Sequence, residues 1–150
     1  MRFNKKKFIY LISPNKITKY FYKHLAAVLK SKKVSFFQLR LKNDSFKKKI
    51  IIGKKVKKIC KRYQTKFLIN DDVLLAKKLN TDGCHLGQKD MSILKARKIF
   101  KNKIISITCH NSIRLAKIAE ENKADYLAFG AFYSSKTKKT KFRANLNLLK

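Results

Sequence analysis

Short apolar runs alternate with longer amphipathic segments along almost the whole chain. Such runs are typical of strands buried on both faces of a sheet, and they cover residues 8–12, 34–39, 66–69, 84–86, 104–107 and 126–129. In the segments between them, apolar residues recur every three or four positions, as they do on the buried face of a helix. Helices are therefore predicted over residues 17–28, 46–63, 72–79, 92–100 and 112–122, and the leucines at 146, 148 and 149 could begin a sixth.

Single helices between the strands predict a parallel sheet with a right-handed crossover at every connection. Asp44 and Ser45 are candidate caps of one helix and Ser92 of another, whereas Gly53 interrupts the helix over 46–63. No linker or low-complexity tract divides the 150 residues. We therefore expect one α/β domain over residues 1–150.

The net charge of +31 by itself favours binding to nucleic acid or to an anionic membrane surface. Most of the 39 basic residues are lysines, however, and they are spread along the chain beside abundant Ile, Asn, Phe and Tyr. This pattern resembles a drift toward A/T-rich codons, so most lysines are interpreted as solvated surface. Only non-specific attraction to polyanions is expected from the charge.

Other features of the composition exclude whole classes of protein. No apolar run reaches the roughly 18 residues that a membrane helix needs. The apolar part of the basic N-terminal stretch, Phe8 to Ile12, is shorter than the core of a signal peptide, so a cytoplasmic protein is expected. Cys60, Cys84 and Cys109 are odd in number and scattered, which indicates reduced thiols rather than a disulfide framework or a zinc site.

Polar side chains gather where the predicted strands end, and in parallel sheets this carboxyl edge carries the chemistry. In chain order they are Gln38, Arg40 and Lys42, then Asn70 and Asp71, then Gly87 to Asp90, then Thr108, and finally Gly130 and residues 134–138. Gln38, Arg40 and Lys42 alternate, so they share one face of the extended chain.

Two carboxylates at these strand ends predict a cation site. Asp71 and Asp90 end neighbouring strands, and Mg²⁺ typically takes one or two carboxylates together with substrate phosphate oxygens. Arg40, Lys42 and Lys138 would supply further positive charge around a di- or triphosphate group. Two nearby acids have simpler interpretations, Asp72 as a helix cap and Asp82 as a turn residue.

At these positions the sequence resembles the thiamine phosphate synthase (thiamine-phosphate pyrophosphorylase) family. The shared pieces are QLRLK at 38–42, LIND at 68–71, DGCHLGQKD at 82–90, ITCH at 107–110, ADY at 124–126 and GAFYSSKTK at 130–138. They follow the family's order at roughly the family's spacing. The resemblance implies a TIM-barrel type (β/α)8 fold, of which about six β/α units are present.

The resemblance also implies a reaction, its cofactor and its residues. Aminopyrimidine methyl diphosphate would be joined to a thiazole phosphate, giving thiamine phosphate and diphosphate, and no nucleophilic side chain is needed because the thiazole nitrogen attacks. Asp71 and Asp90 would hold Mg²⁺. Substrate contacts would come from Gln38, Arg40, Lys42 and Asn70 on the pyrimidine diphosphate, from Ser135, Thr137 and Lys138 on phosphate groups, and from Thr108, where the family usually has Ser.

The sequence departs from the family at its C-terminal end. Ala131 and Ser134 stand where the family commonly has Pro, and Ser135 stands for Thr in a loop with one extra residue. The family's seventh and eighth strands, with a Gly-Gly turn that binds the thiazole phosphate, have no counterpart. A C-terminally truncated domain is therefore expected.

Several other interpretations stay open. His85, within a strand, is expected to pack or to line a site, and the adjacent Cys109 and His110 point to opposite faces, which argues against a catalytic dyad. The alternatives to a synthase are a thiazole tautomerase-like or inactive relative on the same fold, and a basic nucleic-acid-binding fragment. The expected partners are small-molecule substrates, with a homo-oligomer as a further possibility.

Overall fold

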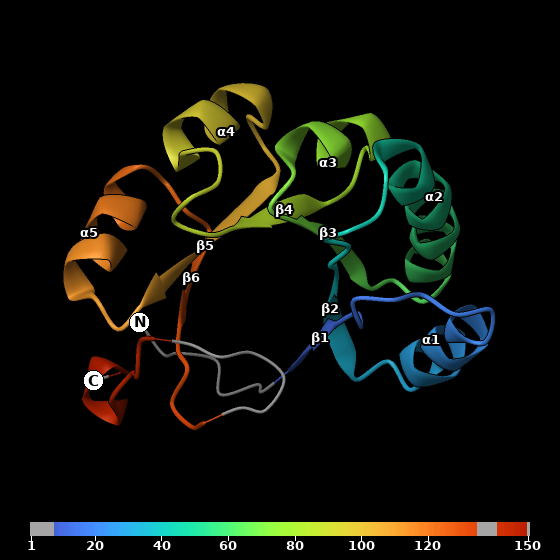
Figure 1. Ribbon diagram of the computed structural model, residues 1–150, viewed down its shortest axis with the longest axis horizontal. Coiled ribbons are helices and arrows are strands. Elements are labelled where there is room, and N and C mark those ends of the chain that lie inside the picture. The colour runs from blue at the N-terminus through green and yellow to red at the C-terminus, as the bar shows by residue number, and fades with distance from the viewer. Residues whose placement is uncertain (1–7, 135–140, 150) are drawn as a thin grey trace. The chain divides into compact units, whose positions relative to one another are not determined.

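Strands and helices alternate through the chain in a computed structural model that describes residues 8–134 and 141–149 (Figure 1). The elements are β1 (Ile9–Ile12), α1 (Phe21–Lys30), β2 (Val34–Leu39), α2 (Phe46–Arg62), β3 (Lys66–Asn70), α3 (Val73–Leu79), β4 (Gly83–Leu86), α4 (Ile93–Ile99), β5 (Ile104–His110), α5 (Ile113–Glu121), β6 (Tyr126–Phe129) and the 3-10 helix η1 (Leu146–Leu149). All six predicted strands and five predicted helices are confirmed, while the leucines near the end form only the short η1.

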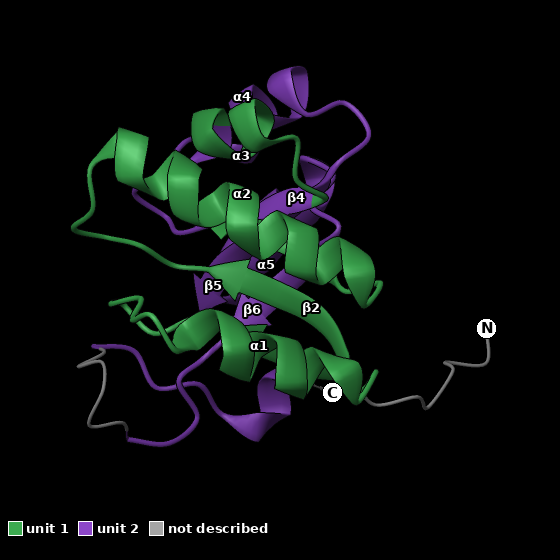
Figure 2. Cartoon of the chain, turned by 90° about the vertical axis from the view of Figure 1, so that its right-hand side faces the viewer, with its two compact units in different colours: residues 1–70, 74–82 green, residues 71–73, 83–150 purple. Residues whose placement is uncertain are grey.

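The chain divides into two compact units (Figure 2). Unit 1 comprises residues 1–70 and 74–82, and unit 2 comprises residues 71–73 and 83–150. In unit 1, β1, β2 and β3 are parallel neighbours, and in unit 2, β4, β5 and β6 are parallel neighbours. The parallel pairing confirms the prediction drawn from single intervening helices. Within residues 8–134 and 141–149 no helix combines the length and apolarity needed to cross a membrane.

The core of unit 1 forms where β2 and β3 pack beneath their helices. Phe37 and Phe67 are register partners, each about 1% exposed, and their rings stack at 6.4 Å. Leu29 of α1 and Val56 of α2 are fully buried. The strands and helices thus form because their apolar faces cover one another, at roughly 25 cal/mol for each Å² of apolar surface removed from water.

Serine side chains start three of the helices. The hydroxyl oxygens of Ser45, Ser92 and Ser112 each accept a hydrogen bond from the backbone N–H three residues later, at 3.4, 3.4 and 3.2 Å. Each bond satisfies one of the amides that a helix leaves without an internal partner. The predicted caps at Ser45 and Ser92 are confirmed; Asp44 instead pairs with Lys48 at 2.5 Å.

Two glycines are explained by close approach rather than by a turn. A Cβ on Gly53 of α2 would collide with the Leu79 side chain, so the glycine lets α3 pack against α2. A Cβ on Gly83 would collide with the backbone oxygen of Ile104, its register partner on β5. The glycine that interrupts the pattern of α2 therefore serves packing.

Two aspartates each form the same reciprocal pair of hydrogen bonds with a strand residue. The N–H of Asp82 donates to the carbonyl of Phe67, and its carboxylate accepts from the N–H of Phe67, both at 2.9 Å. Asp125 repeats the pattern with Ile105, at 2.8 and 2.7 Å. Asp82 is thus more than the turn residue expected from the sequence, because its side chain ties the segment after α3 to β3 within unit 1.

Arg97 of α4 reinforces the second of these aspartates. Its guanidinium donates to the carbonyls of Lys103 at 2.7 Å and Lys123 at 2.6 Å, and to the carboxylate of Asp125 at 2.7 Å. One planar side chain therefore joins the start of β5, the end of α5 and the start of β6.

Replacing Asp125 should destabilise the chain. In Asp125→Ala the N–H of Ile105 loses its carboxylate acceptor and Arg97 loses its ion pair, so we expect unfolding to become easier by about 1–3 kcal/mol. Urea unfolding followed by circular dichroism measures this change. Glu121→Ala, at an exposed position of α5, removes the same charge and should cost far less. Equal losses in the two variants would refute this structural role of Asp125.

The three cysteines are buried free thiols, as the sequence predicted. Burial, with a smaller contribution from the negative charge of Asp82, raises the pKa of Cys60 from 9.0 to about 12. Burial likewise raises the pKa of Cys84 to about 12, and it raises the pKa of Cys109. A buried thiol keeps its proton because the thiolate would lose its hydration.

These raised pKa values predict a loss of stability in alkali. Below pH 9 both states keep the thiol protons, but above it the unfolded chain ionises first, so the folded state loses stability as the pH rises toward 12. Between pH 8 and 10 we expect a loss of about 1.4 kcal/mol for each of Cys60 and Cys84. Urea titrations at both pH values, on the native chain and on a Cys60→Ala, Cys84→Ala variant, measure the difference in slope. Identical slopes would contradict the assignment.

Candidate functional site

Gln38 lies near the carboxyl end of β2 and is held by β1 and by the segment that follows it. Its side chain is 2% exposed, and its Nε2 donates to the Tyr10 hydroxyl at 2.8 Å. Its backbone carbonyl accepts from the N–H of Ser13 at 2.9 Å, and the Ser13 hydroxyl accepts from the N–H of Arg40 at 2.9 Å. These bonds fix the backbone on both sides of Leu39 and orient the Gln38 amide.

Arg40 and Lys42 place positive charge beyond the end of β2. The half-buried Arg40 donates from Nη1 to the Asn15 side-chain oxygen at 2.5 Å, and Lys42 is exposed. Asn15 is a neutral amide, so this bond orients the guanidinium without neutralising its charge. An oriented guanidinium beside a lysine is suited to a phosphate group.

Asn70 belongs to the same edge of unit 1. Leu39 of β2 is the register partner of Ile69 of β3, so Arg40, directly after β2, and Asn70, the last residue of β3, lie at the same level. Gln38, Arg40 and Asn70 thus lie at the carboxyl ends of two paired strands of unit 1, and their role as substrate contacts stays a prediction. The partners of these residues, Tyr10, Ser13 and Asn15, were missed, although Pro14 in the sequence marks the loop that carries two of them.

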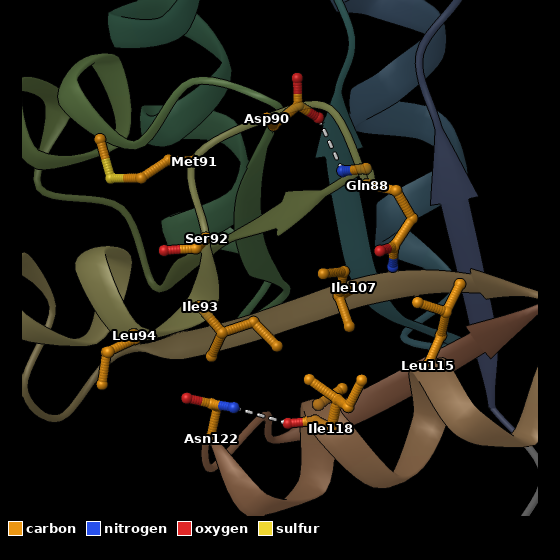
Figure 3. A pocket seen from close by; sticks show the side chains of 12 residues that line it. Gln88, Asp90, Met91, Ser92, Ile93, Leu94, Ile107, Leu115, Ile118 and Asn122 are labelled. Carbon is orange, nitrogen blue, oxygen red and sulfur yellow. Dashed lines mark hydrogen bonds between the residues drawn. The ribbon is translucent and has the colours of Figure 1, made fainter.

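The two predicted metal ligands both belong to unit 2. The N–H of Asp71 donates to the carbonyl of His85 at 2.7 Å, and its backbone adopts a positive φ of 66°, which aspartate tolerates. Asp90 closes the β4–α4 turn, because its Oδ2 accepts from the N–H of Gly87 at 2.6 Å (Figure 3). Both side chains are half-buried.

This donor set fits a hard cation that shares its ligands with a substrate. Carboxylate oxygens are what Mg²⁺ prefers, and the second oxygen of Asp90 points away from the turn bond to Gly87 (Figure 3). No group of three His, Cys, Asp or Glu side chains suited to a metal occurs in residues 8–134 and 141–149. Two carboxylates completed by phosphate oxygens and water suit Mg²⁺. The described residues do not provide a metal site made of such protein side chains alone.

A chain of side-chain hydrogen bonds runs along β4 and β5 in unit 2. His85 lies with Nδ1 2.8 Å from the Ser106 hydroxyl and with Nε2 2.9 Å from the Thr108 hydroxyl. The Gln88 amide donates to the backbone carbonyl of Thr108 at 2.6 Å. Thr108 is therefore fixed through both its side chain and its backbone. His85 lines this part of the structure, as predicted, while its bond to Ser106 was not foreseen.

A small cavity lies beside the β4–α4 loop (Figure 3). Its volume is about 190 Å³, and Gly87, Gln88 and Asp90 line one side of it. The remaining lining is largely apolar and comes from α4, β5 and α5, including Ile93, Ile107, Leu115 and Ile118. An apolar lining does not suit a diphosphate, so this cavity is not the predicted phosphate site.

The last strand leads into the loop that carries the remaining predicted contacts. Ser135, Thr137 and Lys138 lie outside the described residues. On either side of them, Gly130 donates its N–H to the carbonyl of His110 at 2.8 Å, and Phe142 stacks on the His110 ring at 4.2 Å. Cys109 is fully buried while His110 faces Phe142, so the two do not form a dyad, as predicted.

Comparison with known sequences finds one family over nearly the whole chain. The sequence model described as "Thiamine monophosphate synthase" matches residues 9–150. The thiamine-phosphate synthase of Pelagibacter ubique (strain HTCC1062) is 69% identical over 146 residues, which are 97% of this chain and 70% of that protein. The thiamine-phosphate synthase of Nitrosococcus oceani is 42% identical over 117 residues, which are 77% of this chain and 54% of that protein.

A solved structure gives the same result for the fold. The thiamine phosphate pyrophosphorylase from Pyrococcus furiosus superposes with a TM-score of 0.76 at 28% identity, over 84% of this chain and 61% of that one. The chain thus spans between about half and 70% of the length of these relatives. The predicted barrel-type α/β fold is confirmed, with six strands and the helices between them in the described residues.

Sequence and fold agree over the same region. Because the match runs from the first residue of β1 past all six strands and includes the strand ends that carry Gln38, Asp71 and Thr108, the chain belongs to the thiamine monophosphate synthase family.

Proposed function

We propose that this chain acts as a transferase that joins 4-amino-2-methyl-5-hydroxymethylpyrimidine diphosphate to a thiazole phosphate, forming thiamine phosphate and releasing diphosphate. The observation that carries the proposal is the 69% identity to a thiamine-phosphate synthase over 97% of the chain. The polar strand ends support it, because they hold the cations, amides and carboxylates that a diphosphate substrate requires.

The residues of unit 1 suit the pyrimidine diphosphate. In the reaction, the bond between the methylene carbon and the diphosphate oxygen breaks, and both electrons leave with the diphosphate. Negative charge therefore grows on the leaving group, where the guanidinium of Arg40 and the ammonium of Lys42 would stabilise it. Asn15 holds that guanidinium in place before substrate arrives, so little reorganisation is needed.

Gln38 and Asn70 would orient the substrate rather than react with it. The Gln38 amide is buried and held by Tyr10, so its remaining polar positions have a fixed direction. A fixed amide can recognise the ring nitrogen and amino group of an aminopyrimidine through a donor and an acceptor. The cation left on the pyrimidine methylene is then attacked by the thiazole nitrogen, which explains why no nucleophilic side chain is required.

The residues of unit 2 suit a metal and phosphate oxygens. Asp71 and Asp90 would hold Mg²⁺, which when bound neutralises charge on the diphosphate. Thr108 would contact a phosphate oxygen through its hydroxyl, and we assign the same role to Ser135, Thr137 and Lys138. Retention of both aspartates and of the QLRLK segment at 38–42 favours a synthase over a tautomerase-like or inactive relative.

Further properties stay predictions. The charge of +31 predicts salt-sensitive, non-specific binding to polyanions, and no feature of the described residues favours a nucleic-acid function over the synthase. A cytoplasmic location and a homo-oligomer are the expectations drawn from the sequence.

The metal assignment can be tested by assay. The chain is mixed with both phosphorylated precursors and Mg²⁺, and thiamine phosphate is quantified by conversion to thiochrome. We expect Asp71→Asn and Asp90→Asn to lower the rate at least about 100-fold, and Glu121→Gln to leave it unchanged. Absence of product from the folded native chain would refute the synthase proposal. Full activity of both asparagine variants would refute the metal site alone.

The role of Arg40 can be tested separately. Arg40→Gln removes the charge placed for the leaving group, so we expect kcat/KM for the pyrimidine diphosphate to fall about 100-fold. Arg114→Gln, at an exposed position of α5, removes the same charge from the surface and serves as the control. Equal effects of the two variants would show that Arg40 contributes only to the general electrostatic field.

A further inference from the structure

His85 has no role in the reaction as proposed, yet it links two hydroxyl groups. Its partners Ser106 and Thr108 are two residues apart on β5 and therefore share one face of the strand. Ser106 is fully buried, and Thr108 is half-buried near the carboxyl end of β5. The hydrogen-bond chain Ser106–His85–Thr108 thus runs from the core toward the strand end where a phosphate contact is proposed.

A neutral His85 ring allows this hydrogen-bond chain only two directions. A neutral imidazole has one N–H donor and one acceptor nitrogen, so the two hydroxyls cannot both donate to it. In the first direction, Thr108 donates to Nε2, Nδ1 donates to Ser106, and the Ser106 hydroxyl donates to the backbone carbonyl of Cys84 at 3.5 Å. The hydrogens on the Thr108 hydroxyl, on Nδ1 and on the Ser106 hydroxyl then all have acceptors inside unit 2.

In the second direction every bond of the chain is reversed. Ser106 donates to Nδ1, and Nε2 donates to the oxygen of Thr108. The hydroxyl hydrogen of Thr108 is then directed away from the ring and needs an acceptor elsewhere. Only this arrangement lets Thr108 donate to a ligand while its bond to His85 is kept.

An anionic phosphate oxygen distinguishes the two directions, because it accepts hydrogen bonds and cannot donate them. It would meet lone pairs of Thr108 in the first direction and a hydrogen in the second. Charge-assisted bonds of this kind are about twice as strong as neutral ones. The bond from Gln88 to the Thr108 carbonyl holds the backbone, so the hydroxyl can respond without displacing β5.

We propose that His85 is a positioning residue: diphosphate at Thr108 shifts the His85 proton from Nδ1 to Nε2, and this tautomer turns the Thr108 hydroxyl into a phosphate donor. The change removes the proton from Nδ1 and adds one at Nε2 by exchange with water, while Ser106 and Thr108 each keep one hydroxyl hydrogen, so the total charge of the chain is unchanged. It rests on the proposed function in one respect, that Thr108 contacts the diphosphate.

Nitrogen-15 NMR of the ¹⁵N-histidine-labelled chain tests the proposal directly. Long-range ¹H–¹⁵N spectra identify which ring nitrogen lacks a proton, and His85→Gln assigns the signals among His24, His85 and His110. On saturation with inorganic diphosphate and Mg²⁺, we expect the unprotonated-nitrogen signal of His85 to move from Nε2 to Nδ1, with His24 unchanged. An unchanged His85 tautomer in the diphosphate-bound chain would overturn the proposal, and so would a lack of diphosphate binding by calorimetry.

A pair of substitutions separates positioning from mere packing. Thr108→Ser keeps the hydroxyl and should keep the tautomer shift, whereas Thr108→Val keeps the shape and should abolish it. We expect Thr108→Val to weaken diphosphate binding roughly 10- to 100-fold. Thermal unfolding by circular dichroism confirms that both variants fold. A shift that persists in Thr108→Val would overturn the proposal.

The result of the tautomer test does not depend on catalytic turnover. Inorganic diphosphate is the reaction's product and needs neither precursor, so the tautomer shift is read without any assay of thiamine phosphate. A shift in a chain that makes no product would refute the synthase proposal and uphold the role of His85. Product formation without a shift would support the synthase proposal and refute the role of His85.

Discussion

The register between parallel neighbours in each unit fixes where the polar side chains of the site can lie. The interior residues of β3, β4 and β5 are mostly buried, so ligand-binding groups on these strands are confined to the strand ends. Pairing of Leu39 with Ile69 sets Arg40 and Asn70 at one level in unit 1. Pairing of His85 with Ser106 builds the hydrogen-bond chain of unit 2 in the same way.

Four acidic residues of this basic chain lie near strand ends, and their roles differ between the amino and the carboxyl ends. Asp82 and Asp125 precede strands, and their carboxylates accept hydrogen bonds from the N–H groups of Phe67 and Ile105. Asp71 and Asp90 follow strands and are the residues assigned to the metal. Stability is thus secured at the amino ends of the strands, while the carboxyl ends are left for chemistry, as in other barrels of parallel strands.

Sequence patterns predicted the elements because helix and strand periods reflect which faces are buried, and they predicted the Ser45 and Ser92 caps because capping is local. They did not predict the support given to Gln38 by Tyr10, or to His85 by Ser106, since these contacts depend on register between strands distant in sequence. Gly53 weakened the prediction of α2. The contact that explains this glycine is with the Leu79 side chain of another helix, which a local pattern does not show.

Arg97 occupies a position that lysine cannot fill in the same way, although lysine is the commoner basic residue in this chain. One guanidinium reaches two backbone carbonyls and a carboxylate in two different connections, α4–β5 and α5–β6. An ammonium is a point charge on a flexible stem and cannot reproduce that planar span. Codon drift can therefore exchange arginine for lysine on solvated faces but not at such junctions. Arg97→Lys would therefore keep the charge and lose the span, so position 97 depends on the shape of its side chain and not on its charge alone.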